Sequence, residues 1–165
     1  MRLVFIIWIV LGCSMLRAQP KHPTNKYFWS SLETTASPET IWKIWMDVPN
    51  WKNWDTGLKE ASIQNKLNLN VKGKLVSLEN RMTKFKIVEF IEGKSYTFKT
   101  KLPFGSLFVK RYLEFNNGTT IYTHEVWFKG LTSGLFANAF GERFRTMLPG
   151  VLQNINKISM DYDNH

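Results

Sequence analysis

The stretch ASPETIWKIWMDVPNWKNWD, residues 36–55, holds four of the seven tryptophans of the chain and decides how its first half is organised. Ser37 is suited to cap a helix, and Pro38 suits the first helical position. Apolar residues then follow at near-helical spacing as far as Pro49, which ends the helix. The residues after Pro49 leave room for only one more short turn. The stretch therefore predicts two short helices in succession.

Strand-like segments flank this helical stretch on both sides. Before it, residues 26–36 are rich in β-branched and aromatic residues and predict a first strand. The hairpin signal Asn117-Gly118, which also forms a glycosylation sequon with Thr119, is better explained as a turn. Period-two alternation between such turn signals predicts six more strands, at about 58–67, 72–80, 83–91, 94–103, 107–116 and 119–129. We expect these strands to form a meander of hairpins.

The last part of the chain predicts one long helix, because apolar residues recur three or four positions apart over about 27 residues. They are Phe136, Phe140, Phe144, Met147, Val151, Ile155, Ile158 and Tyr162. Pro149-Gly150 falls within this stripe and is expected to kink the helix. The order of elements predicts an α+β fold, in which a seven-stranded antiparallel sheet wraps around the long C-terminal helix. The two short helices after the first strand close one end.

The first residues read as a leader that precedes this domain. Leu3 to Leu16 form an uncharged, mostly apolar run, which is shorter than the roughly 20 residues of a membrane span. It predicts a secretory signal over residues 1–18. A linker (19–26) and the folded domain (27–163) follow.

The same leader has a second interpretation. The sequence IVLGC resembles a bacterial lipobox, in which Cys13, the only cysteine of the chain, would be lipidated. Cleavage after Ala18, lipidation of Cys13 and retention as an anchor stay open. In each case we expect a bacterial protein that is exported, periplasmic or membrane-associated.

Composition limits the class of protein and of partner. A chain of 165 residues favours one domain, and 44% hydrophobic residues exclude a disordered chain. The net charge of +9 favours anionic partners. Lysines on the predicted strands form either a solvated outer surface or a site for an anionic membrane surface, whereas the expected export argues against nucleic acid. They are Lys84, Lys86, Lys99, Lys101 and Lys110.

Several stretches together resemble the polyketide cyclase/dehydrase-like branch of the START and Bet v 1-like superfamily, also called SRPBCC. Residues 36–55 look like its opening helix pair, and TKLPFG (100–105) looks like the exit of its fifth strand. GTTIYTHEVWFKGLTSGLF (118–136) resembles its last strand and the entry to its long helix, and MLPGVLQNI (147–155) resembles that helix. The resemblance implies the helix-grip fold, with a ligand cavity between sheet and helix. It does not fix an activity, since this fold hosts both carriers and enzymes.

The resemblance and strand alternation together predict which side chains line that cavity. They are Leu78, Phe85, Phe98, Leu102, Arg111, Tyr122, His124 and Val126 from the strands, and Phe140, Phe144 and Leu148 from the helix. An inward Arg111 would need a carboxylate, either from a ligand or from Glu89, whereas a bulge or a different strand pairing would place Arg111 outside. His124 either orients a ligand or is a hydrogen-bonded structural histidine.

The four tryptophans of residues 36–55 divide into two pairs. Trp42 and Trp45 are expected in the core, whereas Trp51 and Trp54, which follow the proline, are expected to line the cavity entrance. Asp55 either caps a turn or hydrogen-bonds a ligand. Tryptophan suits such an entrance because its indole N–H can meet a polar partner.

Standard catalytic and metal-binding motifs are absent from the sequence. There is no G-x-S-x-G elbow or P-loop, and two of the three histidines lie near the ends of the chain. We therefore expect no metal and no cofactor. One hypothesis is a carrier or sensor that binds a hydrophobic small molecule or lipid. The other is a polyketide cyclase/dehydrase-like enzyme with His124 as acid/base, and with Tyr122 and Asp55 as further candidates.

Overall fold

A computed structural model describes residues 25–163, so Cys13, the leader and most of the predicted linker lie outside the described residues. The elements, in chain order, are β1 (Tyr27–Thr34), α1 (Pro38–Met46), the 3₁₀ helix η1 (Val48–Asn53), β2 (Leu58–Ile63), β3 (Lys72–Ser77), β4 (Met82–Ile91), β5 (Ser95–Leu102), β6 (Gly105–Asn116), β7 (Thr119–Gly130) and α2 (Ser133–Asp163). This order confirms the predicted α+β arrangement.

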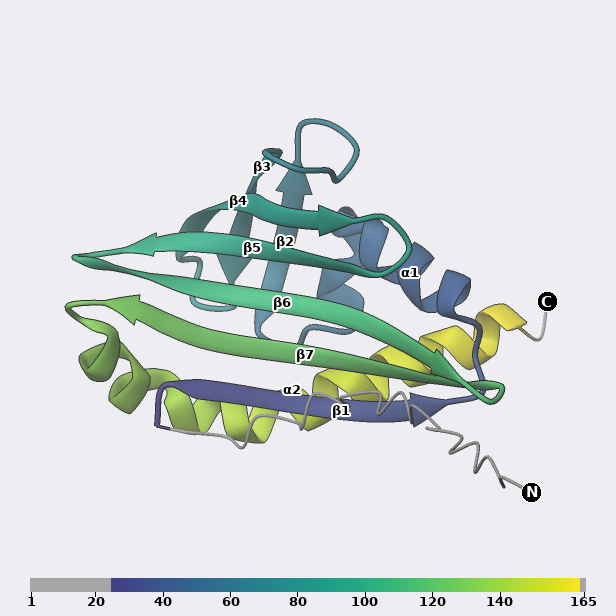
Figure 1. Cartoon of the computed structure of the whole chain (residues 1–165). Helices are drawn as coiled ribbons and strands as arrows, with labels where there is room; N and C mark the ends of the chain where they lie inside the picture. Colours follow the sequence, from purple (N-terminus) through teal and green to yellow (C-terminus); the bar gives the residue numbers. More distant parts are fainter. Residues whose placement is uncertain (1–24, 164–165) are drawn as a thin grey trace, which may run out of the picture.

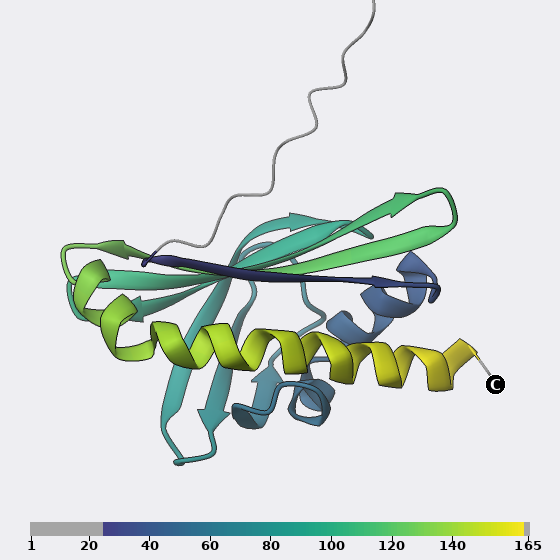
Figure 2. The same ribbon diagram turned by 90° about the horizontal axis from the view of Figure 1, so that it is seen from below.

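All seven strands belong to one antiparallel sheet with the order β1-β7-β6-β5-β4-β3-β2. The six strands β2 to β7 form the predicted meander, and β1 pairs with β7 at the far edge. The sheet curls, and α2 lies along one of its faces (Figure 1 and Figure 2). α1 and η1 connect the two edges of the sheet and lie towards the C-terminal end of α2 (Figure 1).

Local sequence signals explain the two short helices. The Ser37 hydroxyl accepts a hydrogen bond from the Thr40 backbone N–H at 3.0 Å, and so caps α1 as predicted. Pro49 lies in the first turn of η1, where a missing backbone N–H leaves no helical bond unmade. The Asn154 side chain of α2 donates to the Trp54 backbone carbonyl at 3.2 Å, which fastens the end of η1 to the long helix.

The third strand ends earlier than predicted, and this misplaces one predicted cavity residue. β3 stops at Ser77, and the Asn80 N–H donates to the Ser77 carbonyl at 3.0 Å as the chain turns back. Leu78 therefore lies in the turn and is 59% exposed. The prediction that Leu78 faces the interior is wrong, because alternation along a strand does not reveal the residue at which the strand becomes a turn.

The long helix α2 has 31 residues and continues through Pro149 without a break (Figure 2). The residues that it buries most deeply are Ala137, Leu148, Val151, Leu152, Ile155 and Ser159. Phe140 lies outside this face: it is 38% exposed and stacks on Phe136. The prediction that Phe140 closes the interior is therefore wrong. Steps of three and four residues drift around a helix of 3.6 residues per turn, so the ends of a long stripe leave the buried face.

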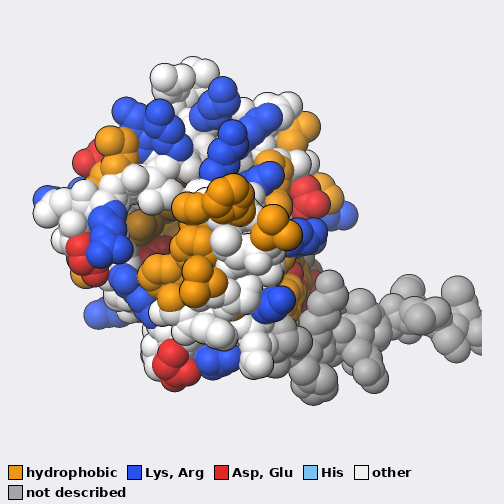
Figure 3. Space-filling view, turned by 90° about the vertical axis from the view of Figure 1, so that its left-hand side faces the viewer, with side chains coloured by type: hydrophobic (Ala, Val, Ile, Leu, Met, Phe, Trp, Pro, Cys, Tyr) orange, Lys and Arg blue, Asp and Glu red, His pale blue; other side chains and the backbone are white. Residues whose placement is uncertain are grey.

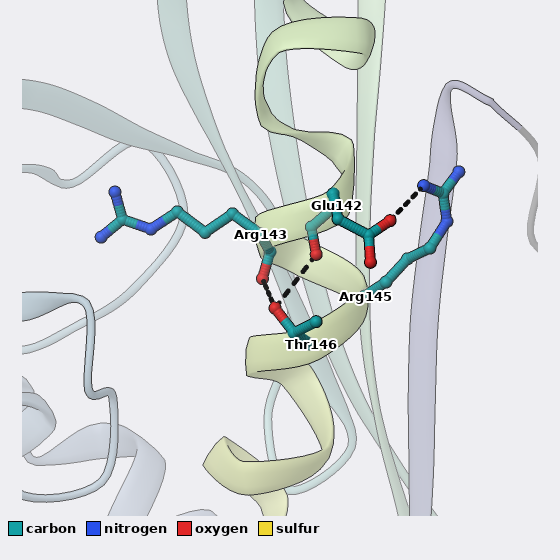
Figure 4. Close-up of polar contacts among 4 residues, drawn as sticks. All are labelled: Glu142, Arg143, Arg145 and Thr146. Carbon is teal, nitrogen blue, oxygen red and sulfur yellow. Dashed lines mark hydrogen bonds and ion pairs between the residues drawn. The ribbon is translucent and has the colours of Figure 1, made fainter.

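The outward side of α2 carries polar contacts. Figure 4 shows Arg143 and Arg145 leaving the helix in opposite directions, the first 3.7 Å from Glu79 and the second 3.1 Å from Glu142. The Thr146 hydroxyl donates back to the helix at 3.1 Å. Exposed ion pairs such as these contribute little to stability, because water screens them. Among residues 25–163, no helix combines the length and the apolar character needed to cross a membrane.

Candidate functional site

Aromatic side chains fill the space between the sheet and α2. The largest fully buried ones are Trp45, Trp51, Trp54, Tyr96, Tyr122 and Phe28. Trp51 is central, because its ring stacks on Phe85, Tyr96 and Phe98 with centroid separations of 5.9, 6.2 and 5.9 Å. The interior of the described domain is therefore packed by its own rings.

A single cation lies within this aromatic interior. Arg111 of β6 is 3% exposed, and its strand position pairs with Tyr96 of β5 on one side and His124 of β7 on the other. Its guanidinium carbon lies 4.4 Å from the ring centroid of Trp51 and 4.6 Å from that of Trp54. The guanidinium also donates a hydrogen bond to the Tyr96 hydroxyl. The inward placement predicted for Arg111 is thus confirmed.

Glu89, the carboxylate predicted to pair with Arg111, has another partner. Glu89 accepts a hydrogen bond from the Thr97 hydroxyl at 2.6 Å, and a bulge in β4 shifts its register against β5. Neither of the two ion pairs found among the described residues involves Arg111. The prediction of a Glu89 partner is therefore wrong, and the cation is held by rings and a phenol instead.

The helix η1 brings two tryptophans to this cation. After Pro49 the chain folds back beneath α1, and the Trp51 indole N–H donates to the Trp45 backbone carbonyl at 2.8 Å. Trp51 and Trp54 are both buried, with their ring centroids 5.8 Å apart. The prediction that they line an open entrance is wrong, because the compact 3₁₀ turn points both rings inward.

Four polar atoms in this cluster are buried without a hydrogen-bond partner among the described residues: Arg111 Nε, His124 Nε2, and the indole nitrogens of Trp45 and Trp54. The His124 ring lies 5.5 Å from Trp45 and 5.9 Å from Trp54, so the four groups form one contiguous set. Three of them can only donate. A buried donor without an acceptor is costly, so these groups have unmet hydrogen-bonding capacity among the described residues.

Burial and the cation together set the protonation of the neighbouring groups. Burial, reinforced by the Arg111 charge, holds the pKa of His124 well below its usual value, so the imidazole is neutral at pH 7. Burial raises the pKa of Tyr96 to about 12, although the Arg111 cation opposes this. Burial also raises the pKa of Asp55, against the opposing effects of Arg111 and of the Gly57 N–H, which donates to the Asp55 carboxylate at 3.0 Å.

Two of the candidate catalytic groups have structural tasks. The Tyr122 hydroxyl donates to the Leu152 backbone carbonyl at 2.8 Å and so joins β7 to α2. The hydrogen bond from Gly57 makes Asp55 a turn cap, which was one of its two predicted roles. His124 is left with a free ring nitrogen inside the cluster.

An open groove lies beside the packed interior. It has a volume of about 380 Å³ and is bounded by α1, the β2–β3 connection and the β4–β5 turn. Its main apolar walls are Trp42, Met46, Leu67 and Phe90. Sequence reasoning missed these residues, and Trp42 was assigned to the core. Helical spacing groups Trp42 with Trp45, but it does not show that Trp42 stands at the margin of the buried face.

Trp42 separates the groove from the buried cation. Its ring lies 6.2 Å from Tyr96 and 6.4 Å from Trp45, and Tyr96 in turn accepts the hydrogen bond from Arg111. On the groove side, the Trp42 ring lies 5.7 Å from Phe90. A chain of contacts from Phe90 through Trp42 and Tyr96 thus connects the groove lining to Arg111.

The other predicted cavity residues lie mostly where alternation places them. Phe85, Phe98, Val126, His124 and Leu148 are buried. Leu102 and Phe144 are partly buried and pack against the core. Their inward placement is confirmed, whereas a ligand-binding role for them stays a prediction. Residues 25–163 contain no group of three or more histidine, cysteine, aspartate or glutamate side chains that could hold a metal ion.

Several solved structures have the same overall architecture as this chain. The di-domain ARO/CYC StfQ from the steffimycin biosynthetic pathway is similar with a TM-score of 0.69 at 8% identity, over 86% of this chain and 53% of that one. A START superfamily protein from Mycobacterium smegmatis is similar with a TM-score of 0.62 at 12% identity, over 83% and 99%. The chain has the helix-grip fold.

Norcoclaurine synthase from Thalictrum flavum shares this helix-grip fold, with a TM-score of 0.60 at 11% identity over 82% of this chain and 86% of that one. These structures confirm the predicted resemblance to the START and Bet v 1-like superfamily at the level of fold. The chain spans about half the length of StfQ. Comparison with family models and with curated proteins finds no match. Identities this low establish the architecture alone.

Proposed function

We propose that this chain binds a hydrophobic small molecule or lipid through an acceptor or anionic head group, and that it acts as a carrier or sensor. The observation that carries the proposal is the Arg111 cation, buried among rings with an unpartnered Nε. Arg111 acts on the Asp55 carboxyl, whose pKa it lowers against the effect of burial, but neither ion pair found among the described residues joins the two side chains. A buried charge that is not directly paired costs several kcal/mol. Contact with Trp51 and Trp54 offsets about 2 kcal/mol of such a cost. A ligand oxygen would supply the acceptor that the described residues do not.

The groove beside α1 supports the apolar half of the ligand. Its volume of about 380 Å³ falls within the range of roughly 300–1,000 Å³ typical of small-molecule sites. Trp42, Met46 and Phe90 offer an apolar wall for a chain or ring system. For the head group to reach Arg111 while the tail stays in the groove, Trp42 would have to rotate and Tyr96, which accepts the hydrogen bond from Arg111, would have to move as well.

An enzyme of the polyketide cyclase/dehydrase type is the second candidate, because His124 is neutral and has an unpartnered Nε2 beside the cation. Two of the similar structures are named as an ARO/CYC protein and a synthase. Against this role, the closest rings to His124 belong to Trp45 and Trp54, and no carboxylate is found to orient its imidazole among the described residues. We therefore favour binding without transformation.

The two candidates differ in what substitution of His124 does. His124→Gln keeps a hydrogen-bonding side chain of similar length, so a carrier should retain ligand affinity within a few-fold. An acid/base catalyst would lose about 10²–10⁴-fold in turnover of its substrate. The measurement is ligand affinity and turnover on the same preparation, with the fold checked by circular dichroism.

The first experiment is native mass spectrometry of the full chain purified from its own host, followed by organic extraction. A co-purified lipid or amphiphile would support the proposal and give its chemical class. Titration of a panel of fatty acids, sterols and quinones would follow, with tryptophan fluorescence as the readout, since three buried tryptophans surround the site. An empty protein whose fluorescence responds to none of these compounds would contradict the proposal.

A further inference from the structure

Large apolar side chains are exposed at one end of the molecule, away from the groove. Phe104 in the β5–β6 turn is 80% exposed, and Leu131 and Leu135 at the start of α2 are 92% and 69% exposed. Figure 3 shows hydrophobic side chains gathered on this end, with lysine and arginine side chains on several sides of them. We call Phe104, Leu131 and Leu135, with the partly exposed Phe136 and Phe140, the apolar tip.

The backbone at Phe104 is in an unfavourable conformation for its side chain. Its φ of 54° lies in the left-handed region, and the other non-glycine residues there are Asn70, Asn80 and Asn117. Asparagine tolerates this conformation, whereas phenylalanine rarely adopts it. Phe104 follows Pro103 in a two-residue turn, at the position where glycine or asparagine is usual. The chain thus presents a benzyl group to solvent where a small polar residue would fold more readily.

Hydrogen bonds join the two loops that form the apolar tip. The Leu131 N–H donates to the Phe104 carbonyl at 3.0 Å, and the Thr132 hydroxyl donates to the Pro103 carbonyl at 2.6 Å. The two loops approach so closely that a Cβ on Gly130 would lie 2.6 Å from the Phe104 carbonyl oxygen. These contacts hold the two loops together, so the exposed side chains point outward from one rigid surface.

Positive charge surrounds the apolar tip. Lys101 and Lys129 are both exposed and both pair across the strands with Ser106, so they flank the hairpin one step behind Phe104. No aspartate or glutamate occurs in residues 93–113 or 126–141, which include the two loops and the strands that lead to them. An apolar centre with a cationic rim matches a surface of anionic headgroups over hydrocarbon.

The chain also enters the domain at this end. The Lys26 side chain, next to the start of β1, lies 3.7 Å from the position of a Cβ on Gly134 in the first turn of α2. Residues 3–16 are uncharged and mostly apolar, and Cys13 lies twelve residues before Asn25, the first described residue. Twelve residues span at most about 40 Å. A leader or lipid anchored in a membrane would therefore keep the apolar tip close to that membrane.

We propose that the apolar tip docks on an anionic lipid surface, with Phe104, Leu131 and Leu135 in the interfacial layer and Lys101 and Lys129 against lipid phosphates. This inference is independent of the ligand site at Arg111, because it uses different residues at the other end of the sheet. Insertion of three large apolar side chains supplies binding energy, and the lysines supply the preference for anionic lipid.

The direct test places an environment-sensitive fluorophore on the full chain. In a Cys13→Ser background, Phe104→Cys would be labelled with nitrobenzoxadiazole, and Ile91→Cys, which is 57% exposed in the β4–β5 hairpin, would serve as the matched control. On vesicles of phosphatidylcholine with phosphatidylglycerol, the probe at position 104 should shift to the blue and be quenched by lipids brominated near the headgroup. The probe at position 91 should not change. Equal responses at the two positions would overturn the proposal.

A second test needs no label. All variants carry the same leader, so differences in co-sedimentation with vesicles report the tip. Phe104→Ser with Leu131→Ser should lower partitioning by roughly tenfold or more. Lys101→Gln with Lys129→Gln should lower it by about fivefold per lysine on anionic vesicles and little on neutral ones. Unchanged partitioning would contradict membrane docking. Self-association that depends on concentration and covers the tip without vesicles would instead favour a second copy of the chain as the partner.

Discussion

The interior of the grip and the apolar tip contain the same kinds of side chain in opposite arrangements. In the interior, Trp51 and Trp54 enclose the cation of Arg111 and shield it from water. At the tip, lysines surround the exposed Phe104 and Leu131. Each arrangement is unfavourable for the isolated domain: one buries a charge without a direct ion pair among the described residues, and the other exposes hydrocarbon and strains a backbone.

The buried Arg111 cation and the apolar tip are the two places where binding partners are to be expected. A buried cation and an exposed apolar cluster both gain free energy only when something else arrives, an acceptor for the first and a lipid surface for the second. The packing of Phe85 over Gly73 leaves no such deficit, since a Cβ at Gly73 would run into the Phe85 ring.

Removal of a ring from the interior should have the largest effect on stability. Trp51→Ala deletes a fully buried indole that stacks on three other rings and on Arg111, so it should lower the free energy of unfolding by about 3–5 kcal/mol. Trp42→Ala, at the partly exposed groove wall, should lower it by only about 1–2 kcal/mol. Urea unfolding measures both. Equal losses would mean that Trp42 is as much a core residue as Trp51.

The neutral His124 predicts an acid-sensitive fold. Because the native pKa lies well below the usual 6.5, the unfolded chain binds a proton below pH 6.5 while the native imidazole does not. The free energy of unfolding should therefore fall as pH drops below 6.5, by up to about 1.4 kcal/mol per pH unit, and be level in this respect above it. Urea unfolding of His124→Gln between pH 5 and 7 should show a flatter profile.

Asp55 gives the opposite sign and serves as the control for that profile. Burial raises its native pKa above 3.8, so the native state holds a proton that the unfolded chain has released, and stability falls as pH rises through that interval. Asp55→Asn should therefore steepen the loss of stability on acidification. A flatter profile in both variants would contradict the assigned directions of the two pKa shifts.

Relief of backbone strain at the tip should stabilise the fold slightly and weaken binding to vesicles. Phe104→Asn places a residue that tolerates positive φ in the β5–β6 turn, so it should raise the free energy of unfolding by up to about 1 kcal/mol. The same variant should bind anionic vesicles less well. Asn117→Phe, in the β6–β7 turn, is the reciprocal control and should destabilise by a similar amount. A destabilised Phe104→Asn would show that Phe104 serves packing.

Much of the fold could be predicted because its signals are local. Ser37 and Pro38 begin a helix, Asn117-Gly118 turns a hairpin, and the apolar stripe of residues 136–162 needs a sheet to cover it. Inward positions on β5, β6 and β7 followed from alternation, which is reliable inside a strand. Leu78 and Phe140 were misplaced at a strand end and near a helix end, where the periodic patterns lose register with the structure.

The site was harder to predict because it depends on how elements pack. The 3₁₀ turn after Pro49 carries Trp51 and Trp54 inward and leaves Trp42 at the groove, and no periodicity distinguishes these three tryptophans. The environment of Arg111 also depends on the bulge in β4 that separates it from Glu89. The tip lies in two loops that meet only in three dimensions.

If the buried Arg111 cation serves a ligand, its charge should set a preference for an acidic head group. Affinities of a fatty acid and of the fatty alcohol of the same chain length would be compared in the native protein and in Arg111→Met, together with the unfolding free energy of both. We expect the native protein to prefer the acid by roughly 10–100-fold and the variant to lose that preference. Arg111→Met should cost little stability, because an apolar side chain replaces a poorly paired buried charge. An unchanged preference in a variant that is severely destabilised would contradict the account and make Arg111 a structural residue.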